Sequence, residues 1–443
     1  MPSSRPCFTV SSRSLRSDEV GTPSHWGDVM VSRQEVAGYL TLGARLAGAL
    51  GRIAADRLEE GLGLALPRTP QQLARPEVVG KLLGSGAPAG APRLAPVRAV
   101  HLPGVDFESS NCTNFLIDVE FEVGRGGGTT RTRPLPMSFY VKLPCSELGT
   151  RAFANAVGFW EVEAAFCERI ASRVPIRVPH VYAVAHRGAR FVLLLENLQE
   201  LPGAKLFINR DMAAGTTPDR AQMCLRTLAE LHVAFWGWTD AQREAVLPAR
   251  LHTFLAPGGR LMTRALNAAA IAPAHKAAPD IFTQDHAGIC RLAIEKWDEL
   301  MDAWYAEPLT LIHGDSHLAN CFEYPTPEGP RMGMVDFQGL QWCKGIRDVQ
   351  YHLINSLEPK VLAAHEGELI DYYVAELRRH RVELDADDAR EQYRALSFQT
   401  LMVAVVSVGL GSLTEREETV RTVLRRSVAA IDRLGFRDWL ADL

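Results

Sequence analysis

One short segment of the chain concentrates side chains that could bind a metal or move a proton. Residues 311–322 read LIHGDSHLANCF, which places His313, Asp315, His317 and Asn320 within eight positions. Imidazole, carboxylate and amide groups at this density occur in metal sites, in proton-transferring loops and in ordinary polar turns. The rest of the sequence must decide among these three interpretations.

A dinuclear metal hydrolase is the first interpretation of the pattern His-x-Asp-x-His. On a strand, His313, Asp315 and His317 would share one face, and their nitrogen and oxygen atoms are usual metal ligands. Such sites need further His and Asp clusters, however, and the other histidines of the chain are isolated. The nearest, His352, follows Asp348 on an expected helix. A metal-dependent phosphoesterase is therefore an alternative that ranks below the others.

Phosphoryl transfer makes more demands, and the sequence meets most of them. The reaction needs a group that orients the acceptor hydroxyl, a divalent metal on the phosphates and a cation that fixes their position. Asp315 would accept or orient the hydroxyl proton, while the amide oxygen of Asn320 would bind the metal. Asp336, in MGMVDFQ (332–338), would supply a second oxygen ligand at the end of a short apolar strand. Hard oxygen ligands of this kind suit magnesium.

The cation has to come from another part of the chain. Lys142 lies inside the expected strand SFYVKLP (138–144), where a charged side chain is costly unless it is paired or solvated. Glu161 and Glu163 on the following expected helix are available partners, and we favour Glu163. The alternative is an edge-strand lysine in water.

The elements that must position these residues change character along the chain. Apolar residues recur every three or four positions in 32–62, which predicts a helix, and a Gly/Ala/Pro linker follows at 84–96. The patterns over 97–198 predict the order β-β-β-α-β-β, with the helix at 151–172. The later patterns are mainly helical, over 217–237, 286–306, 346–358, 362–381 and, in pieces, 386–432.

The sequence therefore predicts an α+β protein with a β-rich lobe followed by a mainly helical lobe. We expect a tail or transit segment at 1–31, helices and a linker at 32–96, the β-rich lobe at 97–200, and the helical lobe with the catalytic segment at 201–443.

Two turns of the β-rich lobe could be taken for a phosphate-binding loop. The glycine cluster GRGGGTTRTR (124–133) lies between two strand patterns that would pair antiparallel, and no helix follows it. A hairpin turn is the better interpretation of that cluster. The earlier turn PGVDFESSNCT (103–113), which also joins two strands, is the candidate for a phosphate cover.

Composition limits the class of protein and its partners. The 443 residues carry a formal net charge of −4, so the chain has no electrostatic footprint for nucleic acid. Its eight cysteines are spread singly, which argues against a zinc ribbon or a disulfide scaffold and fits a reducing compartment. We expect a cytoplasmic protein; nothing in the sequence indicates its oligomeric state.

Two segments bear on membranes and targeting. The uncharged segment 395–414 has only about ten continuously apolar residues, whereas a spanning helix needs roughly 20, so we expect a buried core helix and no membrane span. The N-terminal residues 1–17 are rich in arginine and serine and contain no acid. That bias is typical both of an organelle transit peptide and of a disordered tail, and organelle import stays open.

Five features of the chain together resemble one known group of enzymes. They are HGD-x4-N (313–320), VDFQ (335–338), a strand lysine (142), the helical E-x-x-F (163–166) and LLLENL (193–198). The combination is similar to the aminoglycoside phosphotransferase/choline kinase-like superfamily, and most similar to its ecdysteroid kinase-like branch.

This resemblance implies a two-lobed protein-kinase-like fold, ATP as phosphate donor, Mg²⁺ as cofactor and a small-molecule hydroxyl as acceptor. Residue by residue, it implies Asp315 as the catalytic aspartate, with Asn320 and Asp336 as magnesium ligands. Lys142 and Glu163 would be the pair that holds the phosphates.

The resemblance also implies binding residues around the nucleotide. Glu196, Asn197 and Leu198 would form the hinge, whose backbone groups receive adenine. Asn197 stands where an acid is common in this branch.

The phosphate cover departs from the glycine-rich loop of many kinases. The turn 103–113 has a single glycine, so Ser109, Ser110 and Asn111 would have to hold phosphate through backbone groups and hydroxyls.

The histidines have weaker assignments. His317 would either donate to the γ-phosphate or order the loop, and both readings stay open. His313 is expected to pack the loop, and Asp348 to support it.

The sequence thus predicts an ATP- and Mg²⁺-dependent small-molecule kinase; the alternative is a pseudokinase-type module that binds nucleotide or partner without transfer. The acceptor's identity is not predicted.

Overall fold

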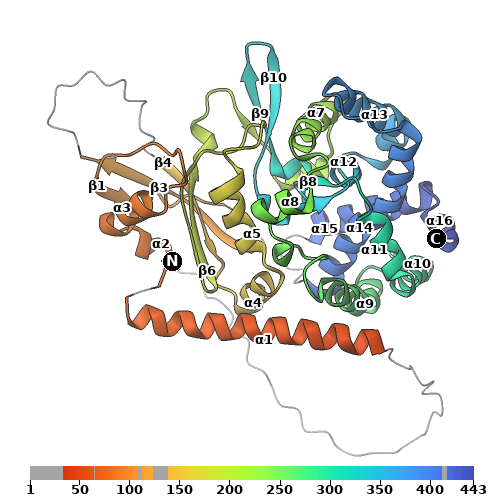
Figure 1. The fold of residues 1–443 in the computed structure, drawn as a ribbon, viewed down its shortest axis with the longest axis horizontal. Coiled ribbons are helices and arrows are strands. Elements are labelled where there is room, and N and C mark those ends of the chain that lie inside the picture. The colour runs from red at the N-terminus through yellow and green to blue at the C-terminus, as the bar shows by residue number, and fades with distance from the viewer. Residues whose placement is uncertain (1–32, 64, 108–110, 123–137, 412–416) are drawn as a thin grey trace, which may run out of the picture.

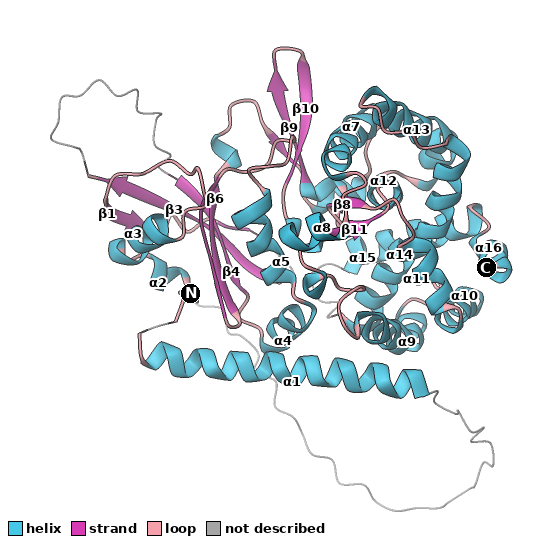
Figure 2. Ribbon diagram, viewed as in Figure 1, coloured by secondary structure: helices cyan, strands magenta, loops and turns pink. Residues whose placement is uncertain are grey.

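The structure, a computed structural model, describes residues 33–63, 65–107, 111–122, 138–411 and 417–443. The predicted tail at 1–31, the glycine cluster 124–133 and two of the proposed phosphate contacts, Ser109 and Ser110, lie outside the described residues. Within them, the chain forms a β-rich lobe followed by a helical lobe, as predicted (Figures 1 and 2).

The first lobe is built on an antiparallel sheet with the strand order β1-β3-β4-β6-β5, and β2 pairs with the outer part of β3. Strands β3, β4 and β6 are almost wholly buried, which fits their apolar sequences and places Lys142 of β4 in the interior. Asn114 and Leu193 lie on either side of that lysine. The strands are β1 (Val97–His101), β2 (Asp106–Phe107), β3 (Cys112–Phe121), β4 (Ser138–Pro144), β5 (Val181–Arg187) and β6 (Arg190–Glu196).

The helical segment that follows β4 is not continuous, so the prediction of one helix over 151–172 is wrong. It divides into α4 (Leu148–Val157), α5 (Phe159–Ala165) and a π-helical turn at Phe166–Ile170. The break is at Gly158, whose φ of 85° is left-handed and is readily adopted only by glycine. Because α5 starts anew after this residue, its axis is set independently of α4. Glu163 of α5 reaches Lys142 of β4.

The second lobe is a helical assembly with one continuous apolar core. Its longest helix, α14, packs against α9. The sequence analysis missed α9, because its alanine-rich sequence has a weak apolar stripe and contains Pro273. The helices are α6 (Asn209–Ala214), α7 (Pro218–Phe235), α8 (Asp240–Val246), α9 (Gly259–Ala277), α10 (Gln284–Glu295), α11 (Trp297–Trp304), α12 (Ile346–Ser356), α13 (Pro359–Arg379), α14 (Ala386–Leu410), α15 (Glu417–Arg433) and α16 (Phe436–Asp442).

Helix α14 contains residues 395–410 of the uncharged segment 395–414, and residues 412–414 lie outside the described residues. Among the described residues it is the one helix that is long and apolar enough to cross a membrane by length and composition, and 67% of its most apolar window is buried. It packs against α9, α12 and α15. This burial is what a core helix of the lobe requires.

Two small sheets in the second lobe carry the predicted catalytic segment, residues 313–320. The first pairs β8 (Thr310–Ile312) with β11 (Gln341–Cys343), and the second has the order β10-β9-β7. The strands of the second sheet are β7 (Lys205–Leu206), β9 (Cys321–Thr326) and β10 (Gly329–Met334). The loop from 313 to 320 therefore leaves one sheet and enters the other, which fixes both of its ends.

Helix α1 (Arg33–Gly61) lies across both lobes (Figure 1). At one end Gly38 packs closely on α9, where a Cβ would come within 2.5 Å of the Leu261 carbonyl oxygen. At the other end Asp56 accepts a hydrogen bond from the main-chain N–H of Ala189, and Glu60 pairs with the buried Arg190. The short helices α2 (Pro70–Leu73) and α3 (Pro76–Ser85) then lead to the sheet.

His252, in the segment between α8 and α9, should make stability depend on pH. Its ring is buried, Nε2 donates to the Trp342 carbonyl, and Nδ1 accepts from the N–H groups of Phe254 and Leu255, so it is neutral in the folded protein. Burial lowers the pKa of His252 to about 4. The unfolded chain therefore binds the extra proton between pH 6.5 and 4, and stability falls as the pH falls through this window.

Between pH 7 and pH 5 we expect this one residue to contribute a loss on the order of 2 kcal/mol. Urea unfolding of wild type and His252→Gln at pH 7 and pH 5 measures it: the wild type should lose more stability between the two pH values than the variant does. Equal losses would show that His252 does not titrate this way.

Candidate active site

The loop after β8 begins with a turn that only glycine can make. Gly314 has a φ of 82°, and a Cβ there would lie 1.9 Å from the Gly339 carbonyl oxygen. The turn brings the loop directly against the residues after β10. The segment 313–320 and the segment that follows Val335 are thereby held in close contact.

Asp348 of α12 stabilises the same turn through hydrogen bonds. Its fully buried carboxylate accepts hydrogen bonds from the main-chain N–H groups of His313, at 2.6 Å, and Gly314, at 2.9 Å. His232 of α7 lies 3.2 Å from the same carboxylate and donates its ring N–H to it. Burial alone would raise the pKa of Asp348, but the hydrogen bond from His232 and the charges around it lower it overall. These contacts are those of a loop-supporting residue.

Replacing this carboxylate by an amide should cost stability. In Asp348→Asn the NH₂ group faces N–H donors, so at least one hydrogen bond to a charged acceptor is lost, for about 3 kcal/mol. Denaturant unfolding at pH 7 measures the loss, and Asp371→Asn, at an exposed surface position, is the control. An unchanged midpoint for Asp348→Asn would contradict the supporting role.

Asp315 and Asn320 face each other across the loop. The amide nitrogen of Asn320 donates to the Asp315 main-chain oxygen at 2.8 Å and to its carboxylate at 3.0 Å. These two bonds fix the amide so that its oxygen, Oδ1, is the atom left for a ligand. The Asp315 side chain is 26% exposed, so its carboxylate is open to a substrate.

The two histidines of the loop differ in what their rings contact. His313 is fully buried: Nε2 donates to the Val335 carbonyl and Nδ1 accepts from the Asp315 N–H, so neither nitrogen is free to act as a base. His317 Nε2 lies 3.5 Å from the Asp315 carboxylate, and its ring stacks on Tyr351. His317 therefore touches the carboxylate itself, and both readings of its role stay available.

Tyr351 is a contact of Asp315 that the sequence analysis did not identify. Burial, followed by the charge of Asp315 and a hydrogen bond to it, raises the pKa of Tyr351 well above its usual range. The phenol is thus a neutral donor next to the carboxylate. Position 351 lies one helical turn after Asp348 on α12, and this spacing could have pointed to it.

Lys142 joins the two lobes at this site. Its ammonium lies 2.6 Å from Glu163 of α5 and 3.0 Å from Asp336, so the predicted Lys142–Glu163 ion pair is present. Lys142 and Glu163 are both almost fully buried, whereas the Asp336 side chain is 28% exposed. An ammonium has three donors, and these two carboxylates take two of them. The third is available for a phosphate oxygen.

The pKa values of Lys142 and Glu163 are set by their burial and by the charges next to them. Burial, with a smaller contribution from the charge of Asp336, raises the pKa of Glu163 to about 7 against the lowering effect of Lys142. Burial would lower the pKa of Lys142, but Asp336 and Glu163 together raise it well above its usual range. The lysine therefore stays charged, and Glu163 is the group that titrates.

Asp336 itself is held in a strained backbone conformation. Its φ of 65° is left-handed, which is unfavourable for a residue with a side chain and is concentrated at functional sites. The next residue, Phe337, stacks on Phe166 at a centroid distance of 3.7 Å. The strained turn thus directs Asp336 toward Lys142 while the following ring anchors it to the β-rich lobe.

Asn111 and Gln338 form a second link between the lobes, one that sequence reasoning missed. The Asn111 amide donates to the side-chain oxygen of Gln338 at 2.7 Å, and its own oxygen accepts from the Cys112 thiol. The Asn111 side chain is therefore engaged, so the predicted phosphate contact at this residue would have to come from its main chain. This places the end of the turn 103–113 beside the segment that carries Asp336.

The predicted hinge residues begin with Glu196, the last residue of strand β6, and Asn197 and Leu198 follow it. The Glu196 carboxylate accepts from the Arg177 guanidinium and from the main-chain N–H of His180, and the Asn197 amide donates to Ser138. These side chains tie β6 to its neighbours. Leu198 is buried.

The donor set of the site suits the groups that the sequence predicts. Asn320 Oδ1 and the carboxylates of Asp315 and Asp336 are hard oxygen ligands, which magnesium prefers. Among the described residues, the only group of three or more His, Cys, Asp or Glu side chains whose ligand atoms lie within 4.8 Å of one another is Cys224, Cys321 and His352. The His-x-Asp-x-His pattern itself therefore forms no such cluster there. The metal-hydrolase interpretation would need such a cluster at His313, Asp315 and His317, and the described residues do not form one.

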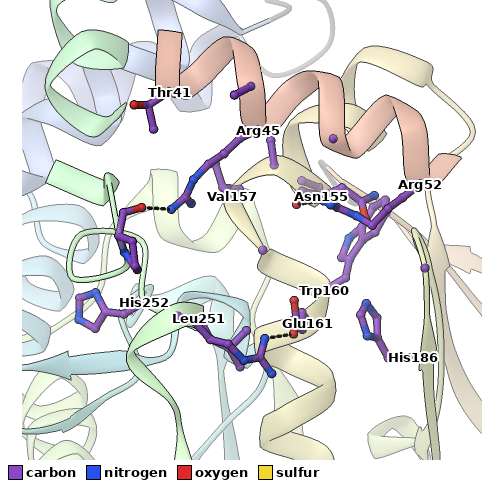
Figure 3. Close-up of a pocket in the computed structure, with 18 residues that line it drawn as sticks. Thr41, Arg45, Arg52, Asn155, Val157, Trp160, Glu161, His186, Leu251 and His252 are labelled. Atoms are coloured by element: carbon purple, nitrogen blue, oxygen red, sulfur yellow. Dashed lines mark hydrogen bonds and ion pairs between the residues drawn. The ribbon is translucent and has the colours of Figure 1, made fainter. Parts of the chain in front are cut away.

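A separate cavity of about 760 Å³ lies beneath α1 (Figure 3). Arg45 donates to the Pro257 carbonyl on one side, and Arg250 pairs with Glu161 of α5 on the other. Its lining within the described chain includes none of the predicted site residues. The arrangement around Asp315 is therefore independent of this cavity.

The model of the ecdysteroid kinase-like family matches residues 115–386, which is more than half of the chain. A comparison with curated proteins found no match.

Three solved structures show a weaker likeness. A Ralstonia eutropha protein described as an aminoglycoside phosphotransferase is 14% identical, with 82% of this chain and 98% of that chain covered and a TM-score of 0.47. A Plasmodium vivax ethanolamine kinase is 13% identical, with 72% and 78% covered and a TM-score of 0.45. A choline kinase from Streptococcus pneumoniae is 10% identical, with 76% and 94% covered and a TM-score of 0.42.

Proposed function

The chain belongs to the ecdysteroid kinase-like family, and on that premise we propose that it is a kinase that uses ATP and Mg²⁺ to phosphorylate a hydroxyl group of a small molecule. One observation carries the proposal. Lys142 of the β-rich lobe lies 3.0 Å from Asp336 of the helical lobe, so a phosphate-binding cation and a metal-binding carboxylate meet at the catalytic loop.

Each residue of the site has one task in this reaction. Asp315 orients the acceptor hydroxyl and takes its proton as the hydroxyl oxygen gains the γ-phosphoryl group and ADP is released. Asn320 and Asp336 hold Mg²⁺, which neutralises charge on the phosphates when it is bound. Lys142, fixed by Glu163, directs its remaining donor at the phosphates.

The nucleotide lies between the lobes in this proposal. The main chain at Glu196, Asn197 and Leu198 receives the adenine ring. The turn 103–113 covers the phosphates through Ser109, Ser110 and the main chain of Asn111. His317, beside Asp315, either contacts the γ-phosphate or keeps the carboxylate in place.

The test is transfer of labelled phosphate from ATP to a metabolite extract in the presence of Mg²⁺. Wild type should label at least one metabolite, and chelation of Mg²⁺ should abolish the labelling. ATP binding in the presence of Mg²⁺ with no transfer to any metabolite class would overturn the proposal and favour a pseudokinase-type binding module.

A further inference from the structure

Three side chains that the proposed reaction does not use meet directly behind the catalytic loop. They are Cys224 of α7, Cys321 at the start of β9 and His352 of α12, and their ligand atoms all lie within 4.8 Å of one another. The two cysteines are 2% exposed and the histidine is fully buried. Three separate elements of the helical lobe thus present two sulfurs and one nitrogen to a single point.

The histidine is in the form that a metal requires. His352 Nδ1 lies 2.8 Å from the Ser316 carbonyl oxygen, and because a carbonyl can only accept, Nδ1 carries the proton. Nε2 is therefore the unprotonated nitrogen. It is buried and receives no hydrogen bond of ordinary geometry from the described residues. A ring that donates its other N–H to a backbone carbonyl is the usual arrangement of a metal-bound histidine.

The spacing of the sulfurs also fits an ion. Cys224 Sγ and Cys321 Sγ are 3.9 Å apart. Two thiolates bound tetrahedrally to one zinc ion, at about 2.3 Å each, are separated by about 3.8 Å. The observed separation is nearly twice the length of a disulfide bond. The sulfurs need almost no movement to bind an ion together.

Charge decides between the two ions that such ligands favour. Sulfur and imidazole ligands select zinc or monovalent copper. Two thiolates and a neutral imidazole carry a charge of −2, which a divalent ion cancels and a monovalent ion leaves half-compensated. A net charge in this fully buried position would be costly. The surroundings therefore favour the divalent ion.

We propose that Cys224, Cys321 and His352 form a buried structural site for one Zn²⁺ ion. Cys321 directly follows Asn320, and Ser316, whose carbonyl orients His352, directly follows Asp315. The ion would therefore fix the middle of the loop 313–320, through His352, and its C-terminal end, through Cys321, to α7 and α12. Because the ligands are inaccessible from solvent, the ion enters during folding.

The first experiment uses the wild-type full chain. The protein, without an affinity tag and purified without chelator, should contain about one zinc per chain by mass spectrometry of the metal. After unfolding with chelator, refolding with Co²⁺ should give the intense near-ultraviolet absorption of thiolate-bound cobalt. No zinc in the purified protein, together with no such absorption after refolding, overturns the site. Loss of two hydrogens from the Cys224–Cys321 peptide pair, which indicates a disulfide, also overturns it.

A matched pair of variants locates the metal. The zinc content of Cys224→Ser should be at least about tenfold lower than that of wild type, because one of the three ligands is removed. Cys290→Ser changes an equally buried cysteine on α10, outside the cluster, and should retain zinc at the wild-type level. Equal zinc contents in the two variants would overturn the assignment. If Cys224→Ser does not fold, the cobalt spectrum of the wild type still decides.

Discussion

The variant Asp315→Asn should lose about 10³-fold in kcat while it still binds ATP. The amide has the shape of the carboxylate and can still accept the hydrogen bond that Asn320 donates at 3.0 Å, so the loop is expected to keep its conformation. It cannot, however, take the proton of the acceptor hydroxyl. The loss should therefore appear in kcat and leave the dissociation constant of ATP within a few-fold of wild type.

The measurement needs a control for general damage. Asp371→Asn, at an exposed position on α13 where the carboxylate pairs with Arg390, should retain full activity. Thermal unfolding of both variants near the wild-type temperature would show that the fold is intact. Unaltered kcat in Asp315→Asn would show that another group takes the proton, and the assignment of this loop would be wrong.

The local parts of the site could be predicted from the sequence, and the structure shows why. Asp315 and Asn320 lie in one short loop, so their spacing in the chain sets their spacing in space. Lys142 and Glu163 are 21 positions apart, but a polar residue in a buried strand requires a partner, and the next helix offers few. In both cases the chain itself limits the choices.

Long-range contacts were not predictable in the same way. His232 and Asp348 are 116 positions apart, and the Asn111–Gln338 pair spans 227. No periodicity or spacing links such residues, because only the packing of the completed lobes brings them together. The same holds for the Cys224, Cys321 and His352 cluster.

The errors in secondary structure have local causes. Gly158 interrupts an otherwise helical pattern, and a glycine in a helix is often tolerated, so the left-handed break could not be distinguished from a continuous helix. Helix α9 was missed because alanines give little contrast between its buried and exposed faces.

The variant Lys142→Met should lose both stability and activity. It leaves the buried Glu163 without its cation, and breaking a buried ion pair on one side costs about 3–5 kcal/mol. The phosphates also lose the donor that positions them, so no transfer is expected. Urea unfolding of the protein without nucleotide or metal measures the first loss, and the phosphate-transfer assay measures the second.

The stability loss should depend on pH in a defined direction. The pKa of Glu163 is raised to about 7, so the folded wild type binds a proton that the unfolded chain releases near pH 4.5. Stability from this group is complete below pH 4.5 and is lost as the pH rises through 7. Removal of Lys142 removes the cation that lowers this pKa, so in the variant the loss continues to higher pH. The difference between variant and wild type should be larger at pH 8 than at pH 6.

The double variant Lys142→Met/Glu163→Gln separates the two roles of the lysine. It has no buried charge at these two positions, so it should recover most of the stability that Lys142→Met loses and should show little of the pH dependence between 6 and 8. It still has no cation for the phosphates, so it should stay inactive. Recovered activity would show that Lys142 serves only the fold. No recovery of stability would show that the loss in Lys142→Met arises from altered packing around Cys112 and Tyr140. Both residues lie near Lys142, since its charge opposes the rise that burial causes in their pKa values.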